Sequence, residues 1–110
     1  MQRILLFFAL SGCIGLSFEE PLEYEWDGAS EGEIITQQTF VCKVDVVLVA
    51  NVTSGSLKLD ASDGTVILAA LEWTEGLVSY KESYKRAAPV EVRLTQQDFN
   101  GTIDFLAQCA

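Results

Sequence analysis

The feature that most constrains this chain is a period-two alternation of apolar and polar side chains, which runs from Ile34 towards the C-terminus. Residues 90–94 show it clearly, because valine and leucine side chains alternate there with Glu91 and Arg93. Successive side chains of a β-strand point to opposite faces, so this pattern predicts strands that are buried on one side. No segment sustains the 3.6-residue stripe of an amphipathic helix. The domain is therefore expected to be all-β.

Turn signals divide this region into about seven strands. Asp63-Gly64 and Asn100-Gly101 have the chemistry of two-residue hairpin turns, and a further turn is expected at residues 74–76. Asn100-Gly101 is the strongest of these signals. Residues 40–49 are predicted to form one strand and residues 57–60 a second, shorter one. This spacing of turns is typical of an antiparallel β-sandwich.

Two cysteines, Cys42 and Cys109, lie beyond the first seventeen residues. An even number of cysteines in an oxidising compartment predicts a disulfide, and closing so long a loop would stabilise the fold by about 4 kcal/mol. Cys42 is in phase with Phe40 and Val44, and Cys109 is in phase with Phe105. The bond is therefore expected to cross the core and join two sheets, as in immunoglobulin-like domains.

The chain begins with one basic residue, Arg3, and a short apolar run that ends at the small residues Gly15 and Ser17. This run is too short for an ordinary transmembrane helix and suits signal peptidase. We expect residues 1–17 to be a signal peptide that is cleaved before Phe18. The mature chain would then lie in the secretory pathway, in the lumen of the endoplasmic reticulum or outside the cell.

Two other interpretations of the N-terminus remain open. Leu10-Ser11-Gly12-Cys13 matches the bacterial lipobox, which would make the chain a lipoprotein acylated at Cys13. Only twelve residues precede this cysteine, and apolar residues continue after it. The other interpretation is a buried N-terminal helix.

Residues 18–33 contain seven acids and no base, with Pro21 and two glycines among them. This composition predicts an extended or partly disordered acidic leader, followed by a β-sandwich domain over residues 34–110. Tyr24 and Trp26 are expected to dock on that domain, the alternative being an exposed recognition motif.

The chain has 16 acidic and 7 basic residues, a formal net charge of −9, and the predicted mature chain carries −10. Such a charge repels phosphates and anionic lipids, so nucleic acids and membrane surfaces are not expected partners, whereas basic proteins are. No later segment is long and apolar enough to span a membrane. Lys81, Lys85 and Arg86 form a candidate interaction loop that opposes the acidic leader.

The composition argues against catalysis. The chain has no histidine, which removes the commonest general base and most zinc sites. No phosphate-binding glycine loop is present. The segment Asp60-Ala61-Ser62-Asp63-Gly64 could hold calcium, but its spacing differs from the calcium-loop pattern and favours an ordinary turn. We therefore expect no enzyme activity, no catalytic residues, no cofactor and no metal ion.

Two N-glycosylation sequons are present, at Asn51-Val52-Thr53 and Asn100-Gly101-Thr102. Both are expected at or beside turns, where a glycan is tolerated. Behind a signal peptide, two such sites favour a eukaryotic secretory glycoprotein over a bacterial lipoprotein.

Several short segments resemble the lumenal domain of the delta subunit of the translocon-associated protein (signal-sequence receptor) family. The similarity is carried by Val78-Ser79-Tyr80, Lys85-Arg86-Ala87 and Glu91-Val92-Arg93-Leu94, and more weakly by Thr39-Phe40-Val41 and residues 57–60. That family continues into a membrane anchor and places its cysteine pair differently. The resemblance implies a small immunoglobulin-like domain without enzyme activity. It would assist protein translocation beside the protein-conducting channel, with other translocon-associated subunits as partners. The competing hypothesis is a secreted or surface-displayed module for adhesion or recognition.

Overall fold

The computed structural model describes residues 20–110, which contain six β-strands and no helix. The predicted signal peptide, the cleavage before Phe18 and the acylation of Cys13 concern residues outside this range. The strands are β1 (Leu22–Ala29), β2 (Glu33–Phe40), β3 (Val44–Ser62), β4 (Ile67–Trp73), β5 (Gly76–Tyr84) and β6 (Val90–Cys109). The described residues hold no helical segment with the length and hydropathy of a membrane span.

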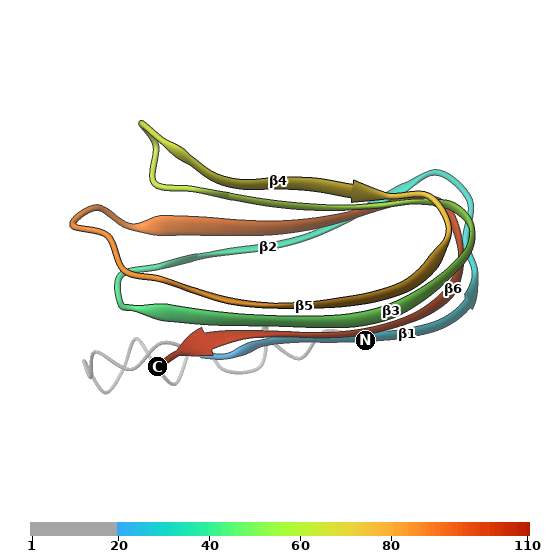
Figure 1. The fold of residues 1–110 in the computed structure, drawn as a ribbon, viewed down its shortest axis with the longest axis horizontal. Coiled ribbons are helices and arrows are strands. Elements are labelled where there is room, and N and C mark those ends of the chain that lie inside the picture. Colours follow the sequence, from blue (N-terminus) through green and yellow to red (C-terminus); the bar gives the residue numbers. More distant parts are fainter. Residues whose placement is uncertain (1–19) are drawn as a thin grey trace, which may run out of the picture.

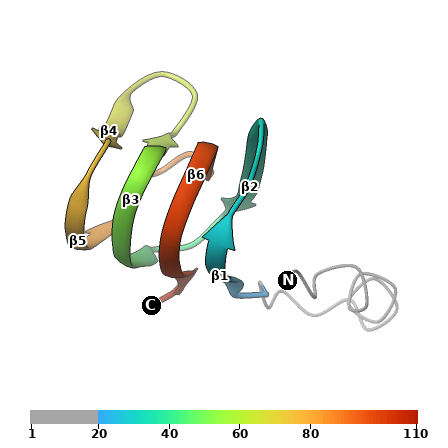
Figure 2. The same ribbon diagram turned by 90° about the vertical axis from the view of Figure 1, so that its right-hand side faces the viewer.

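All strand pairs are antiparallel and belong to one sheet that folds over into two layers (Figure 1). The two long strands β3 and β6 pair with each other and run through both layers. In layer A, β1 and β5 flank the C-terminal half of β6 and the N-terminal half of β3. In layer B, β2 and β4 flank the other halves of the same two strands. Figure 2 shows the strands side by side as they curve from one layer into the other.

β3 and β6 bend from one layer into the other at two glycines, Gly55 and Gly101, each of which lies close to the backbone of the other strand. Gly55 has a φ of +80°, and a Cβ at this position would lie 2.1 Å from the carbonyl oxygen of Asp98. Gly101 has a φ of +150°, and its Cβ would lie 1.9 Å from the carbonyl oxygen of Asn51. Only a residue without a side chain fits at such positions. The register between β3 and β6 shifts at residues 52–56, where both strands turn together.

The core lies between the layers and consists of the side chains that the alternation points inward. Phe40, Phe99 and Phe105 are its largest fully buried side chains. The aliphatic members come mainly from β3 and β6: Val44, Val46, Leu48, Leu57, Leu59, Val90, Val92, Leu94 and Ile103. The alternation therefore predicted correctly which residues of these strands are buried.

The predicted strand over residues 40–49 is in fact interrupted. β2 ends at Phe40 and β3 begins at Val44, and the chain crosses from layer B to layer A between them. Val41, within this crossing, is 69% exposed. The apolar–polar alternation continues through the break because the strands on both sides point their even-numbered side chains into the same core. The sequence pattern therefore does not reveal the crossing.

The predicted strand boundaries in β3 and β6 are also wrong. Residues 57–60 belong to the continuous strand β3, and Asn100-Gly101 lies within the continuous strand β6 instead of forming a hairpin turn. Residues 20–110 consequently contain six strands where about seven were expected. The conformational freedom of Gly101, which suits a hairpin turn, here allows β6 to bend. The strand continues after the bend because its partner β3 bends beside it.

The expected acidic leader is instead part of the domain. Residues 22–29 form the edge strand β1, which pairs with β6 along its whole length, so the sandwich begins well before residue 34. Tyr24 is docked as predicted, since it is 4% exposed and its hydroxyl donates to the buried Gln96 side chain at 2.5 Å. Trp26 is half-buried and packs against the core. Alternation of acids with apolar residues allows this acidic segment to bury one face.

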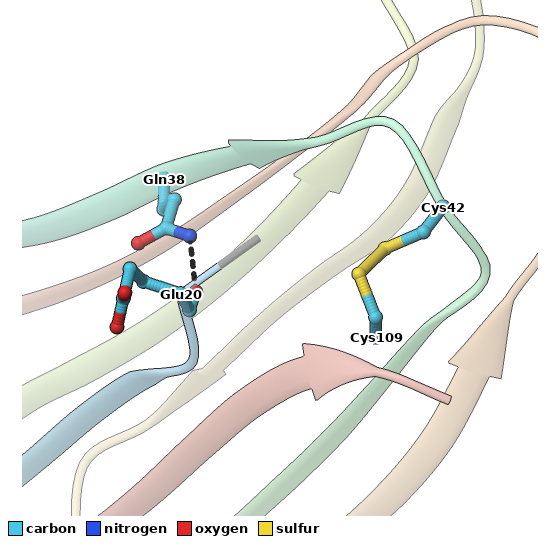
Figure 3. The surroundings of a disulfide bond; sticks show 4 residues. All are labelled: Glu20, Gln38, Cys42 and Cys109. Carbon is cyan, nitrogen blue, oxygen red and sulfur yellow. Dashed lines mark hydrogen bonds between the residues drawn. A yellow bond between two sulfur atoms is a disulfide. The ribbon is translucent and has the colours of Figure 1, made fainter. Parts of the chain in front are cut away.

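The predicted Cys42–Cys109 disulfide is present, with a Cα–Cα distance of 5.7 Å (Figure 3). Cys42 lies in the crossing between β2 and β3, and Cys109 ends β6. The bond therefore ties the crossing to the end of β6 at the open end of the sandwich and does not pass through the centre of the core. Close by, the Gln38 side chain donates to the Glu20 carbonyl oxygen at 2.6 Å. The N-terminal end of the described chain is thus held beside β2.

Candidate binding surface

The outward side chains of layer A form the most distinctive surface of the described residues. Tyr24, Ile103 and Phe105 face the core, so the residues that alternate with them face solvent. We call the resulting surface the acidic face. It comprises Glu23, Glu25, Asp27, Asp45, Val47, Val49, Asn51, Leu77, Ser79, Lys81, Ser83, Thr102, Asp104, Leu106 and Gln108. Five of these residues are acidic and one is basic.

The strand register places like charges opposite each other on this face. Glu25 of β1 lies directly opposite Asp104 of β6, and both side chains are exposed. Asp27 is the next outward residue of β1. Within residues 20–110, these three carboxylates form no hydrogen bond and no ion pair. Like charges directly opposite each other on a sheet reduce its stability.

The outer surface of layer B is arranged differently. There Lys58 of β3 lies opposite Glu72 of β4, and Asp60 of β3 lies opposite Arg93 of β6. Opposite charges at such positions stabilise strand pairing. Both layers carry acids, but among the described strands only the acidic face has carboxylates opposite one another without a base between them.

Apolar side chains lie at the centre of the acidic face. Leu106 of β6 is paired with Val47 of β3, and Val49 follows on the same side of β3. Val49 is 52% exposed, and Leu77, at the end of the face near the bend, is 85% exposed. A shallow, open depression beside them is lined by β1 and β6 through Glu25, Trp26, Asp27, Thr102, Ile103 and Asp104. The face therefore combines an apolar centre with an acidic border.

The two glycosylation sequons lie next to each other at the bend. Asn51 is exposed on β3 opposite Thr102, and Asn100 is half-buried on β6 opposite Ser54. Both asparagines lie in continuous strands, so the expectation of turn positions is wrong. A glycan on Asn51 would project from the acidic face, whose outward row contains this residue.

The candidate interaction loop does not form a single loop. Lys81 lies in β5, whereas Lys85 and Arg86 lie in the connection to β6. The β6 and β3 strands separate β5 from β1, so Lys81 and the acidic residues of β1 lie on opposite edge strands of layer A. Arg86 instead forms an ion pair with Asp63, with its Nε 2.9 Å from Oδ2.

Asp63 organises the turn between β3 and β4, as the turn interpretation predicted. Its Oδ1 accepts hydrogen bonds from the backbone amides of Thr65 and Val66 at 3.0 and 2.8 Å. These bonds, together with the bond from Arg86, hold the pKa of Asp63 well below its usual range. Across residues 20–110, no three acidic or cysteine side chains gather so that they could hold a metal ion.

Sequence reasoning found the acids of β1 but assigned them to a leader, and so missed the acidic face. The alternation Leu22, Glu23, Tyr24, Glu25, Trp26, Asp27 was the available signal, because it places three acids on one side of a strand. The position of Glu25 opposite Asp104 depends on the pairing of β1 with β6, which the sequence does not reveal.

The fold defines a disulfide-bonded, all-β antiparallel sandwich, the layer architecture of immunoglobulin-like domains, here with two strands that continue through both layers. Comparison of the chain with protein-family models, with curated proteins and with solved structures gave no match.

Proposed function

We propose that this chain is a non-enzymatic binding domain of the secretory pathway, and that its acidic face holds a protein partner with basic side chains. The single observation that carries this proposal is the opposition of Glu25 and Asp104, which have no compensating base among residues 20–110. The Cys42–Cys109 disulfide supports an oxidising compartment, in which such bonds persist.

Charge and surface composition together favour a basic protein partner. Arginine or lysine side chains between the opposed carboxylates would relieve their repulsion and form charge-assisted hydrogen bonds. The apolar centre at Val47, Val49 and Leu106 would exclude water from those contacts. A net charge of −9 would also accelerate the approach of a basic partner at low ionic strength.

The test measures binding of a defined basic peptide to the secreted chain by titration calorimetry. The probe is a synthetic peptide of alternating arginine and valine, about as long as β1, and its matched form has glutamine in place of arginine. We expect only the arginine peptide to bind, and we expect added salt to weaken the binding, since ions screen exposed charges. The double variant Glu25→Gln, Asp104→Asn should bind about tenfold more weakly, because two ion pairs are each worth up to about 1 kcal/mol.

The matched control is the double variant Glu31→Gln, Glu33→Gln, which removes two negative charges near the corner between β1 and β2. Both residues are exposed and lie outside the acidic face. This control should retain nearly all of the binding. Equal losses in the two double variants would indicate a general effect of net charge and would contradict a site on the acidic face.

A more specific form of the proposal is the accessory role in protein translocation that the family resemblance implies. The three segments that carry the resemblance most clearly lie in β5, in the following connection and at the start of β6. This role requires the chain to co-purify with translocon-associated subunits from solubilised endoplasmic reticulum membranes, and to lose them in the Glu25→Gln, Asp104→Asn variant. Recovery of the intact chain from the culture medium, without those subunits, would favour a secreted recognition module instead.

A further inference from the structure

The four edge strands of the two layers present different side chains to solvent. β1 carries Glu23, Glu25 and Asp27, and β5 carries Lys81 and Glu82. β2 begins at a glutamate and is otherwise rich in threonine and glutamine. β4, with the sequence ILAALEW, has one charged residue and no proline or glycine. Charges on edge strands are the usual protection against pairing with another chain. β2 and β4 each have one charged residue, but β4 lacks the threonine and glutamine side chains of β2 and is the most apolar of the four edges.

The free edge of β4 is apolar and accessible. Among the described residues β4 pairs only with β3, so the backbone groups along its other side have no strand partner. Ile67 is 73% exposed and the preceding Val66 is 45% exposed. Leu71 and Trp73 point toward the interior but are only half-buried, because no strand covers them on the outer side.

We propose that two copies of this chain associate through β4, with the two strands antiparallel and a two-fold axis near Ala70. This pairing would join two copies of layer B into one continuous sheet. Ala70 would lie opposite its own symmetry mate, Ala69 opposite Leu71, and Ile67 opposite Trp73. Edge pairing of this kind gains main-chain hydrogen bonds together with burial of the flanking side chains. A symmetric two-fold dimer is the commonest form of protein self-association.

Charge explains why a second copy fits this edge. The chain carries a net charge of −9, so most contacts between two copies bring acids together. At β4 the only acid, Glu72, lies opposite Lys58 of the same chain and is compensated there. The uncompensated carboxylates Glu25 and Asp104 belong to layer A. A basic partner gains nothing from this neutral edge, whereas a second β4 offers the matching apolar strand. The inference is independent of the function proposed for the acidic face.

The test is analytical ultracentrifugation of the secreted chain over a range of concentrations, with two variants at the proposed axis. Ala70 is exposed on the outer side of β4 opposite Asp60, which already faces Arg93. Ala70→Lys would place two lysines directly opposite each other in the dimer and should weaken association at least about fivefold. Ala70→Thr places two β-branched hydroxyl residues there and should leave association unchanged or strengthen it.

Thr39→Lys is the matched control, because Thr39 is exposed on β2, the opposite edge of the same layer. It adds the same charge and should leave dimerisation unchanged. Melting temperatures measured at low concentration check that each variant remains folded. A wild-type chain that stays monomeric at every concentration would overturn the proposal, as would a dimer that Ala70→Lys and Thr39→Lys affect equally.

Discussion

Individual residues at the bend decide whether this sheet can fold over on itself. Gly55 and Asp98 meet there through their backbones, and Asp98 is the one non-glycine residue of the described chain with positive φ, at 47°. The Asp98 side chain accepts a hydrogen bond from the Gly32 amide at 2.8 Å, and the Asp98 amide donates to the Gly32 carbonyl oxygen at 2.9 Å. These contacts connect the bend of β6 to the corner between β1 and β2.

Gly55→Ala should be one of the most damaging small substitutions among the described residues. The new methyl group would meet the backbone of Asp98 at 2.1 Å, and the positive φ would add strain. We expect a loss of at least about 3 kcal/mol in the free energy of unfolding, measured by urea denaturation. Gly64→Ala is the matched control, since its φ is +95° but nothing lies within 4 Å of the added Cβ. It should cost about 1 kcal/mol, and equal costs at the two positions would show that close approach is unimportant.

Asp63 makes the stability of the β3–β4 turn dependent on pH. Its pKa in the folded chain lies below the ordinary value near 3.8, chiefly because the Thr65 amide donates to it. Folding therefore favours the ionised form, and this contribution is present above pH 4 and is lost as the pH falls below that value. Asp63→Asn should lower the melting temperature at pH 7, and the difference from the wild type should shrink towards pH 2. Glu75→Gln, in the exposed corner between β4 and β5, is the control for the loss of one negative charge at pH 7.

At the scale of elements, the ends of the sandwich are held by different means. At the bend, β3 and β6 pass from one layer to the other where Gly55 and Gly101 lie against backbone carbonyl groups of the neighbouring strand. At the open end, the β2–β3 crossing is held by the Cys42–Cys109 disulfide and by the Ala110 amide, which donates to the Lys43 carbonyl oxygen at 2.8 Å. The C-terminal end of β6 therefore depends on the disulfide.

Removal of the disulfide should destabilise the whole domain and loosen this end most. The bond joins residues 67 positions apart, and the lost loop constraint is worth about 4 kcal/mol, or less if the reduced chain retains structure. The double variant Cys42→Ser, Cys109→Ser should lower the urea midpoint. Hydrogen exchange should increase first at the end of β6 and at the start of β3. Uniform exchange along β6 would contradict a local role for the bond.

At the scale of the whole molecule, charge is distributed unevenly between two layers that share the same two central strands. Layer B pairs its charges across strands, whereas the acidic face of layer A does not. This arrangement costs stability in the isolated chain, because like charges directly opposite each other on a sheet repel.

Neutralising one of the opposed acids should consequently stabilise the chain. Glu25→Gln removes a repulsion worth about 0.5 kcal/mol and should raise the melting temperature by about 2–4 °C at low salt. Added salt should reduce this gain by screening. Glu72→Gln removes the same charge from opposite Lys58 and should lower the melting temperature or leave it unchanged. A gain from both substitutions would indicate that net charge alone governs the stability.

The sequence by itself determined the strand class, the disulfide and much of the inside–outside pattern. Phe40, Val44, Val46 and Leu48 are buried as their alternation predicts, because side-chain direction in a strand depends only on local geometry. The Cys42–Cys109 pairing also follows from the sequence, since only two cysteines lie beyond the first seventeen residues.

Only the tertiary structure decided where strands cross, bend or reverse, and which faces meet. Asn100-Gly101 has the chemistry of a hairpin turn, yet it bends β6 because β3 bends beside it at residues 52–56. The acids of β1 resemble a solvated leader until pairing with β6 buries Tyr24 and places Glu25 opposite Asp104. Asn51 and Thr102 become neighbours in the same way. Each of these outcomes depends on strand partners distant in sequence, whereas period and turn chemistry report only the local backbone.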